Sequence, residues 1–301
     1  MNNGLIILQK QNLDANIDKL LAQRRLYSNA KIIQYILIAI TVIIPILLTF
    51  ITNFSDLKID DSNWIFAIYA IIVLFLERIL DFFINRNKKT AASIQEKFDV
   101  EIFEIPKNDL LNTTFIDYDI IRKYSKKDKL NSKKVRRVKN WYSTKIERLT
   151  TNIAVIFCQR MNICYDQNIK RKYNILLIIL AVITFIILLG VSLLNDFSLK
   201  KFIIEVILPS IPIFSFTYKE ISTSFDSIDN LQKLREIIET KLNSLSIDDT
   251  IDKEELRNIQ DRIFYNRTSS PLIPDFIYKH LWSELEDQMN YSVEQRINEL
   301  H

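Results

Sequence analysis

YNILLIILAVITFIILLGVSLLN, residues 173–195, is a run of 23 residues without a charged side chain. Residues 32–54 form a second uncharged run of the same length. A helix of about 20 apolar residues can cross a hydrocarbon core of about 30 Å, so both runs predict transmembrane helices. Buried elements of soluble proteins rarely need unbroken runs of this length. The two runs therefore indicate a membrane protein, although the 48% apolar and 25% charged residues resemble a soluble composition.

A weaker apolar run follows each strong one after a short loop. Residues 62–84 are apolar apart from three charges near their end, and residues 202–218 contain one charge, Glu205. Beside a strong span, each weaker run is best interpreted as the second arm of a hairpin. We therefore predict a mainly α-helical, polytopic membrane protein with four transmembrane helices in two hairpins, residues 32–85 and 173–218.

Lys and Arg are distributed unevenly among the segments that flank the four expected spans. The central segment, residues 86–172, holds 21 of them, residues 1–31 hold five and residues 219–301 hold ten, whereas the loop between the first two spans holds only Lys58. Cytoplasmic loops of membrane proteins are enriched in Lys and Arg. The distribution predicts a multi-pass protein with both termini and the central segment in the cytoplasm.

The two terminal segments are expected to be helical. In residues 1–31 the apolar side chains share one side of an amphipathic helix, which either packs on the cytoplasmic part or lies in the membrane interface. In residues 219–301 apolar residues recur every three or four positions, first in a helix continuing out of the fourth span and then in two helices that flank Pro271 and Pro274. The pattern predicts a largely helical cytoplasmic domain.

The central segment carries the largest net charge. Its residues 100–105 are expected to form a short strand that Pro106 ends, and its residues 133–171 a helix that leads into the third span. Residues 86–172 sum to +11 (21 basic minus 10 acidic), whereas residues 219–301 sum to −7 (10 basic minus 17 acidic). Opposite charges of this size indicate either that the two segments dock on each other or that the basic one binds an anion.

Four basic residues of this segment, Lys133, Lys134, Arg136 and Arg137, fall within five positions. We call them the basic run and take them as candidate ligand-binding residues for a small anion such as a nucleotide, since Lys and Arg form charge-assisted contacts with phosphate. Anionic lipid headgroups are an alternative partner. The run could also hold nucleic acid, although we expect neither DNA nor RNA as a partner.

Three charges lie inside the second expected span. At about 1.5 Å per residue from Asn63, Glu77 lies about 21 Å and Asp81 about 27 Å into a core of about 30 Å. Glu77, Arg78 and Asp81 share an arc of about 100° on the helix, and charges within a membrane turn toward protein or water. They either stabilise the bundle through an Arg78–Asp81 pair or line the cytoplasmic mouth of a pore.

The fourth expected span contains two prolines, Pro209 and Pro212. Each removes a backbone donor and clashes with the preceding turn, so a kink is expected there. The kink is either a static feature or a hinge.

Few residues could support catalysis. The only histidines are His280 and His301, and the two cysteines, Cys158 and Cys164, fit no zinc pattern and are expected to be reduced thiols. With two glycines in the chain, no phosphate-cradling loop is present. We predict no catalytic residue, no metal and no cofactor, and we do not expect an enzyme.

Several stretches together resemble a known family. They are LLAQRRLYSNAK (20–31), AASIQEKFDVEIFEIPKN (91–108), CQRMNICYD (158–166), RNIQDRIFYNR (257–267) and LIPDFIYKHLWSELEDQMN (272–290). In these motifs, which extend over nearly the whole chain, the sequence is similar to the SMODS-associating four-transmembrane effector family of bacteria.

The resemblance implies a role in anti-phage systems in which a nucleotidyltransferase makes a cyclic nucleotide signal. The four-span protein would sense that signal and permeabilise the inner membrane, and its helix pairs would rearrange and oligomerise into a leak. The expected partners are a cyclic nucleotide or another small anion, membrane lipid and further copies of the chain. The alternative is a constitutive membrane scaffold or ion channel regulated by a protein partner.

Overall fold

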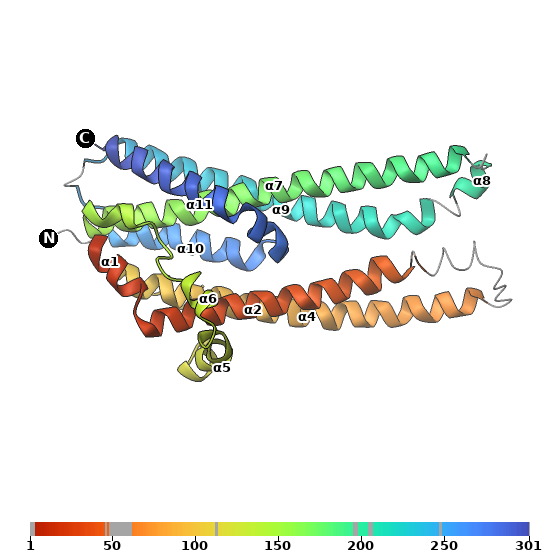
Figure 1. Ribbon diagram of the computed structural model, residues 1–301, viewed down its shortest axis with the longest axis horizontal. Coiled ribbons are helices and arrows are strands. Elements are labelled where there is room, and N and C mark those ends of the chain that lie inside the picture. Colours follow the sequence, from red (N-terminus) through yellow and green to blue (C-terminus); the bar gives the residue numbers. More distant parts are fainter. Residues whose placement is uncertain are drawn as a thin grey trace.

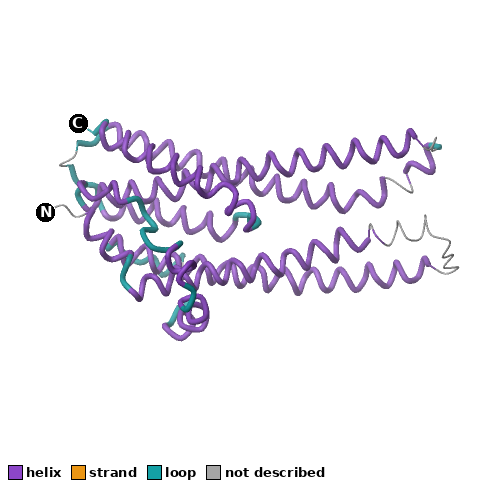
Figure 2. Tube along the Cα trace, in the orientation of Figure 1, coloured by secondary structure: helices purple, strands orange, loops and turns teal. Residues whose placement is uncertain are grey.

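The computed structural model describes residues 4–45, 47, 62–111, 114–194, 198–203, 207–246 and 249–300. Within these ranges the chain is mostly helical and contains no strand, which confirms the predicted α class (Figure 2). The helices are α1 (Gly4–Gln11), α2 (Asp14–Ile38), the π-helical η1 (Ala39–Ile43), α4 (Ser62–Phe103), α5 (Tyr118–Lys129), α6 (Ser132–Arg136), the 3-10 helix η2 (Thr144–Arg148), α7 (Thr151–Leu194), α8 (Leu199–Phe202), α9 (Leu208–Asn243), α10 (Lys253–Ser269) and α11 (Asp275–Asn298).

Two pairs of long helices give the molecule its elongated shape. α2 lies beside α4, and α7 lies beside α9 (Figure 1). One end also holds α1, α5, α6, η2, α10 and α11, together with both ends of the chain, and we call it the packed end. The other end consists of residues 32–45, 62–83, 175–194 and 207–218 of the long helices, and we call it the apolar end.

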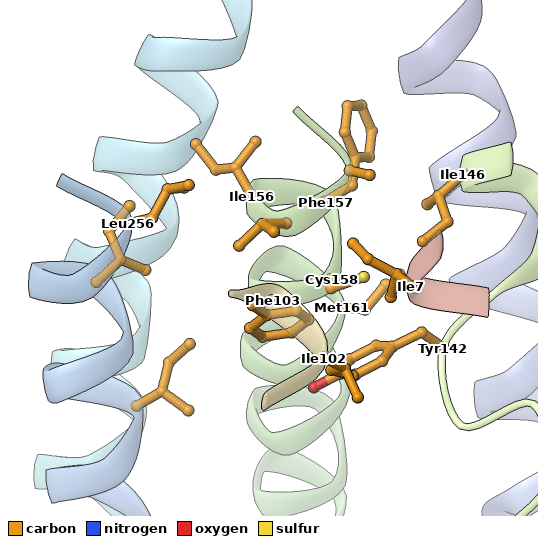
Figure 3. Packing of buried hydrophobic residues seen from close by; sticks show 14 of the residues in the cluster. Ile7, Ile102, Phe103, Tyr142, Ile146, Ile156, Phe157, Cys158, Met161 and Leu256 are labelled. Carbon is orange, nitrogen blue, oxygen red and sulfur yellow. The ribbon is translucent and has the colours of Figure 1, made fainter. Parts of the chain in front are cut away.

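The hydrophobic core lies in the packed end. Ile7 of α1, Phe98 and Phe103 of α4, Phe157 of α7 and Leu256 of α10 are each at most 1% exposed and belong to one cluster (Figure 3). Burying a side chain of this size stabilises the fold by about 1.5–3 kcal/mol. Segments that lie far apart in the sequence are therefore held together here by apolar packing.

Gly4 shows how closely α1 approaches this core. Its backbone N–H donates to the carbonyl oxygen of Leu149 at 2.9 Å. A Cβ atom added at Gly4 would lie 2.0 Å from the carbonyl oxygen of Ile146 in η2. The approach requires a residue without a side chain, which accounts for one of the two glycines.

The apolar end differs, because its large apolar side chains face outward. Leu74 and Phe75 of α4 are 66% and 70% exposed, and Leu194 of α7 is 86% exposed. Among the described residues, two helical segments are long and apolar enough to cross a membrane, Asp14–Ile43 and Thr151–Leu194. A core helix would pass the same test, but only 12% of the apolar window in the second segment is buried. Exposed apolar surface of this extent indicates contact with lipid or with another apolar partner.

Three of the long helices pass through both ends without a break. α4 has 42 residues, α7 has 44 and α9 has 36. At about 1.5 Å per residue each is longer than 50 Å, which exceeds a hydrocarbon core of about 30 Å. The same rigid elements therefore belong to the packed end and to the apolar end.

The short strand expected at residues 100–105 is wrong. α4 continues through Phe103 and ends where Glu104 adopts a left-handed φ of 54°. Ile102 and Phe103, which a strand would point to opposite faces, are both buried in the core as neighbours at the end of a helix. Tertiary packing has overridden local β propensity.

The continuous helix expected over residues 133–171 is also wrong. α6 ends at Arg136, Asn140 adopts a left-handed φ of 52°, and α7 begins only at Thr151. Asn is among the few residues that tolerate the left-handed region, so it favours a helix break at this position. The basic run is consequently separated from the helix that continues into the third expected span.

The two oppositely charged segments dock on each other, which was one of the two alternatives. Lys145 forms an ion pair with Glu294 at 2.9 Å, and Lys172 forms one with Glu284 at 2.6 Å. Both pairs join the central segment to α11. Exposed pairs of this kind contribute about 0–1 kcal/mol each, so they orient the contact more than they stabilise it.

Candidate functional site

The basic run lies on the surface of the packed end, in α6 and the residue after it. Lys133, Arg136 and Arg137 are exposed, whereas Lys134 is half-buried and pairs with Asp128 at 2.6 Å. α6 has five residues, and the side chain of Asn131 caps it by accepting from two of its backbone N–H groups. The structure therefore keeps these four residues together on a short surface helix and the residue after it, with part of their charge already neutralised.

The basic run also meets α2. Arg25 of α2 lies 3.3 Å from the same Asp128 oxygen that Lys134 contacts. Burial, and then the positive charge of Arg137, lower the pKa of Arg24. The positive surface consequently includes α2, a contact that sequence spacing could not indicate.

Glu77, Arg78 and Asp81 lie on α4 in the part of the apolar end that is nearer to the packed end. Arg78 is exposed, and the two carboxylates are half-buried. In the part of the chain that the structure describes, no ion pair joins Arg78 to Asp81. An internal salt bridge therefore does not account for the three charges here, and a pore-lining or bundle-lining role stays a prediction.

The two prolines both lie at the beginning of α9. Pro209 is in its first turn, where a missing backbone N–H costs little, and Pro212 follows inside the helix. The hydroxyl of Ser210 donates to the carbonyl oxygen of Ile207 at 2.8 Å. This is a helix start, which is a position suited to either a fixed bend or a hinge.

A buried polar network inside the packed end was not predicted. Asp99 of α4 is fully buried and accepts three hydrogen bonds, from Tyr142 Oη at 2.6 Å, from Arg267 Nη1 at 2.7 Å and from Gln260 Nε2 at 3.0 Å. Burial and then Asp99 hold the pKa of Tyr142 well above its usual value. We call this set, with the two residues described next, the Asp99 network.

A second carboxylate extends the Asp99 network. Glu96 accepts from Arg257 Nη2 at 2.6 Å and from Gln260 Nε2 at 2.9 Å. Burial raises the pKa of Glu96, and the charge of Arg257 opposes that rise. Buried charges are tolerated only where they are paired and hydrogen-bonded, so these contacts fix the position of α10 on α4.

The Asp99 network adjoins one of the two cysteines of the chain. The nearby Cys158 is fully buried, and burial followed by the charge of Asp99 holds its pKa well above the usual value. A thiol in that environment stays protonated and inert. Among the described residues, no three His, Cys, Asp or Glu side chains are grouped so that they could hold a metal ion.

A second buried polar cluster lies where the packed end meets the apolar end. Lys170 of α7 donates to Asp166 at 2.5 Å, to Ser227 of α9 at 2.7 Å and to Ser270 at 2.7 Å. Burial lowers the pKa of Lys170, and Asp166 opposes that effect. Polar residues within an otherwise apolar helical pattern are the one signal of this cluster in the sequence, and they do not indicate which residues pair.

Comparison with known proteins agrees with this architecture. A model of the SMODS-associating 4TM effector domain matches residues 6–296. A protein of Bacillus cereus described as a probable CBASS effector molecule is 31% identical over 279 residues, which covers 90% of this chain and 92% of the relative. No solved structure matches the chain. Because the match extends over nearly the whole chain, this protein belongs to the SMODS-associating four-transmembrane effector family.

Proposed function

We propose that this protein is the membrane effector of a bacterial anti-phage signalling system, which senses a cyclic nucleotide in the cytosol and permeabilises the inner membrane. Family membership supports the effector role, since the relative is described as a probable CBASS effector. Four spans in two hairpins, with both termini in the cytoplasm, fit the two candidate spans and their neighbours α4 and α9.

The observation that carries the proposal is the continuity of the long helices. In α7, Phe157 is fully buried in the packed end, whereas Ile186 in the apolar end is 61% exposed. No linker separates the two parts of this helix. A ligand that rearranges the packed end can therefore move the membrane part directly, as in switches that act through a rigid element with two arrangements.

The leak itself requires more than one copy of the chain. Both helix pairs expose apolar side chains at the apolar end, including Phe82 of α4 and Ile187 of α7. A surface of this kind can face lipid in a resting state and pack against another copy in an active state. We propose that the signal favours the second arrangement, with Glu77, Arg78 and Asp81 lining the path and the start of α9 at Pro209 and Pro212 absorbing the movement.

The proposal is tested in cells that co-express the protein with the nucleotidyltransferase of its system. A membrane-potential dye should report depolarisation with the active nucleotidyltransferase and none with a catalytically inactive one, at equal amounts of membrane-inserted protein. Depolarisation with both would indicate a constitutive channel. An abundant, inserted protein that never depolarises the cells would contradict permeabilisation.

A further inference from the structure

An open cleft lies in the packed end between α7, α9 and α11. The basic run is not part of its lining, which includes Arg160, Cys164 and Tyr165 of α7, Arg235 of α9, and Gln288 and Ser292 of α11. We call this cleft the arginine cleft.

The charges in the arginine cleft are incompletely compensated. Arg160 donates from Nε to Glu239 at 2.8 Å and from Nη1 to Ser292 at 3.0 Å. Arg235 lies 3.6 Å from the same Glu239 carboxylate, and Arg296 reaches it at 3.0 Å. One carboxylate therefore faces three guanidinium groups, of which Arg296 has a second partner in Glu299 at 2.6 Å.

The two arginines of the lining keep donors for a further anion. A guanidinium carries five N–H donors, and its planar fork matches the oxygens of a phosphate. Arg160 is held rigidly, with a side chain 5% exposed, whereas the side chain of Arg235 is 34% exposed. One donor group is thus fixed in place and the other can close on a ligand.

The remaining lining suits the uncharged part of a nucleotide. Tyr165 offers an aromatic ring and Gln288 an amide, beside apolar contacts from Met161, Leu285 and Met289. Ligand sites commonly combine a mainly apolar lining with a few polar groups that set orientation. An anion with an attached planar base fits this combination better than inorganic phosphate alone.

We propose that the arginine cleft binds the phosphate-bearing signal, with Arg160 and Arg235 contacting its phosphate; this inference rests on the proposed function. The cleft joins α7 and α9, and both helices continue into the apolar end (Figure 1). Binding there would draw the two arms of one hairpin and α11 together. The basic run lies in α6, a short helix that ends well before α7 begins and does not itself continue into the apolar end.

Cys164 makes binding measurable without any leak. It lines the cleft, whereas Cys158, the other cysteine, is fully buried. Purified full-length protein in neutral detergent is treated with a maleimide in the presence of a panel of cyclic mono-, di- and trinucleotides. An occupied cleft should slow alkylation of Cys164, and Cys164→Ser supplies the background.

Arg235→Ala is the decisive variant, since Arg160 is embedded in the fold and its loss could prevent folding. Loss of one charge-assisted contact should raise the nucleotide concentration that half-protects Cys164 by about 10- to 100-fold. Lys233→Ala is the matched control, since this exposed residue of the same helix forms, among the described residues, an ion pair with Asp229 alone, at 2.6 Å. In the control and in the double variant Arg136→Ala with Arg137→Ala, the nucleotide concentration that half-protects Cys164 should equal that of the wild type.

The outcomes separate the two proposals. If a nucleotide protects Cys164 and Arg235→Ala weakens that protection, the arginine cleft is supported even if no leak follows. A missing leak would then count against permeabilisation alone. Signal-dependent depolarisation with an unchanged response in Arg235→Ala would overturn the cleft and leave the proposed function standing. The cleft is equally overturned if no member of the panel slows alkylation of Cys164, or if Lys233→Ala weakens protection as much as Arg235→Ala.

Discussion

The packed end and the apolar end are built from the same long helices but differ in how their side chains are buried. In α7 residues 153–158 are fully buried in the core cluster, whereas Ile183 is 48% exposed and Leu194 86% exposed. The packed end also buries charged networks, which require exact partners. The apolar end needs only a surface that lipid or another copy of the chain can cover. Specific side-chain contacts therefore determine the structure of the packed end, whereas the surrounding lipid or protein determines what the apolar end contacts.

The largest effect is expected from breaking the Asp99 network. Asp99→Ala leaves the buried guanidinium of Arg267 without the carboxylate that it contacts at 2.7 Å. Removing one partner of a buried ion pair costs about 3–5 kcal/mol, so the unfolding temperature in detergent should fall sharply. The matched change Asp229→Ala removes an exposed pair with Lys233 and should cost at most about 1 kcal/mol. Equal losses for the two variants would show that the buried Asp99–Arg267 pair matters no more to stability than an exposed pair does.

The next largest effect compares two isoleucines of nearly equal exposure. Ile183 in the apolar end is 48% exposed, and Ile237 in the packed end is 50% exposed. Arg at the centre of a membrane helix costs about 2.5–3.5 kcal/mol, whereas a surface substitution in water changes stability by at most about 0.5 kcal/mol. Ile183→Arg should therefore reduce the membrane-inserted fraction after carbonate extraction, and Ile237→Arg should not. The same fraction for both would remove the distinction between the two ends.

A moderate, pH-dependent effect is expected where the two ends meet. Burial raises the pKa of Glu220 in α9 to about 7, although a hydrogen bond from Tyr173 opposes the rise. Between the unfolded value of about 4.5 and this pKa the folded state binds more protons than the unfolded state, so stability falls as pH rises through this window.

Glu220→Gln stays neutral and should lack that part of the decline. Relative to the wild type, the variant should gain about 1–3 kcal/mol in stability between pH 5 and pH 8. Thermal unfolding of both proteins over this range measures the difference. A constant difference at all pH values would mean that the carboxyl group of Glu220 titrates normally.

The smallest effect on stability is expected in the basic run. Arg136 and Arg137 are exposed and no ion pair holds them in the described part of the chain. The double change Arg136→Ala with Arg137→Ala should shift stability by less than about 0.5 kcal/mol per residue. Signal-triggered depolarisation should also persist, because we place the ligand in the arginine cleft. Complete loss of the response in a fully expressed double variant would indicate that the ligand binds at the basic run and not in the arginine cleft.

Sequence patterns could predict the helices but not their partners. Uncharged runs such as residues 173–195 identify membrane segments by length alone. The pairing of Asp99 with Arg267 depends on a contact between residues that are 168 positions apart. No local spacing encodes such a contact. The strand expected at residues 100–105 is wrong for the same reason, because packing in the core and not the local sequence decides the conformation of these residues.

The candidate site shows the same limit. The basic run is conspicuous because its four charges are adjacent in sequence. The arginine cleft is inconspicuous, because Arg160 and Arg235 come from helices far apart in the chain and meet only through the shared Glu239. Single charges within helical patterns give little signal until the helices are packed.

Accessibility of single cysteines from outside the cell tests most directly whether the two ends lie in different environments. In a Cys164→Ser background, Ser198→Cys places a thiol at the far tip of the apolar end and Ser132→Cys places one on the surface of the packed end, both at exposed positions. With a membrane-impermeant maleimide on intact spheroplasts, we expect Ser198→Cys to be labelled and Ser132→Cys to be labelled only after permeabilisation. Labelling of Ser132→Cys in intact spheroplasts would contradict a cytoplasmic packed end, and with it the sensing of a cytosolic signal.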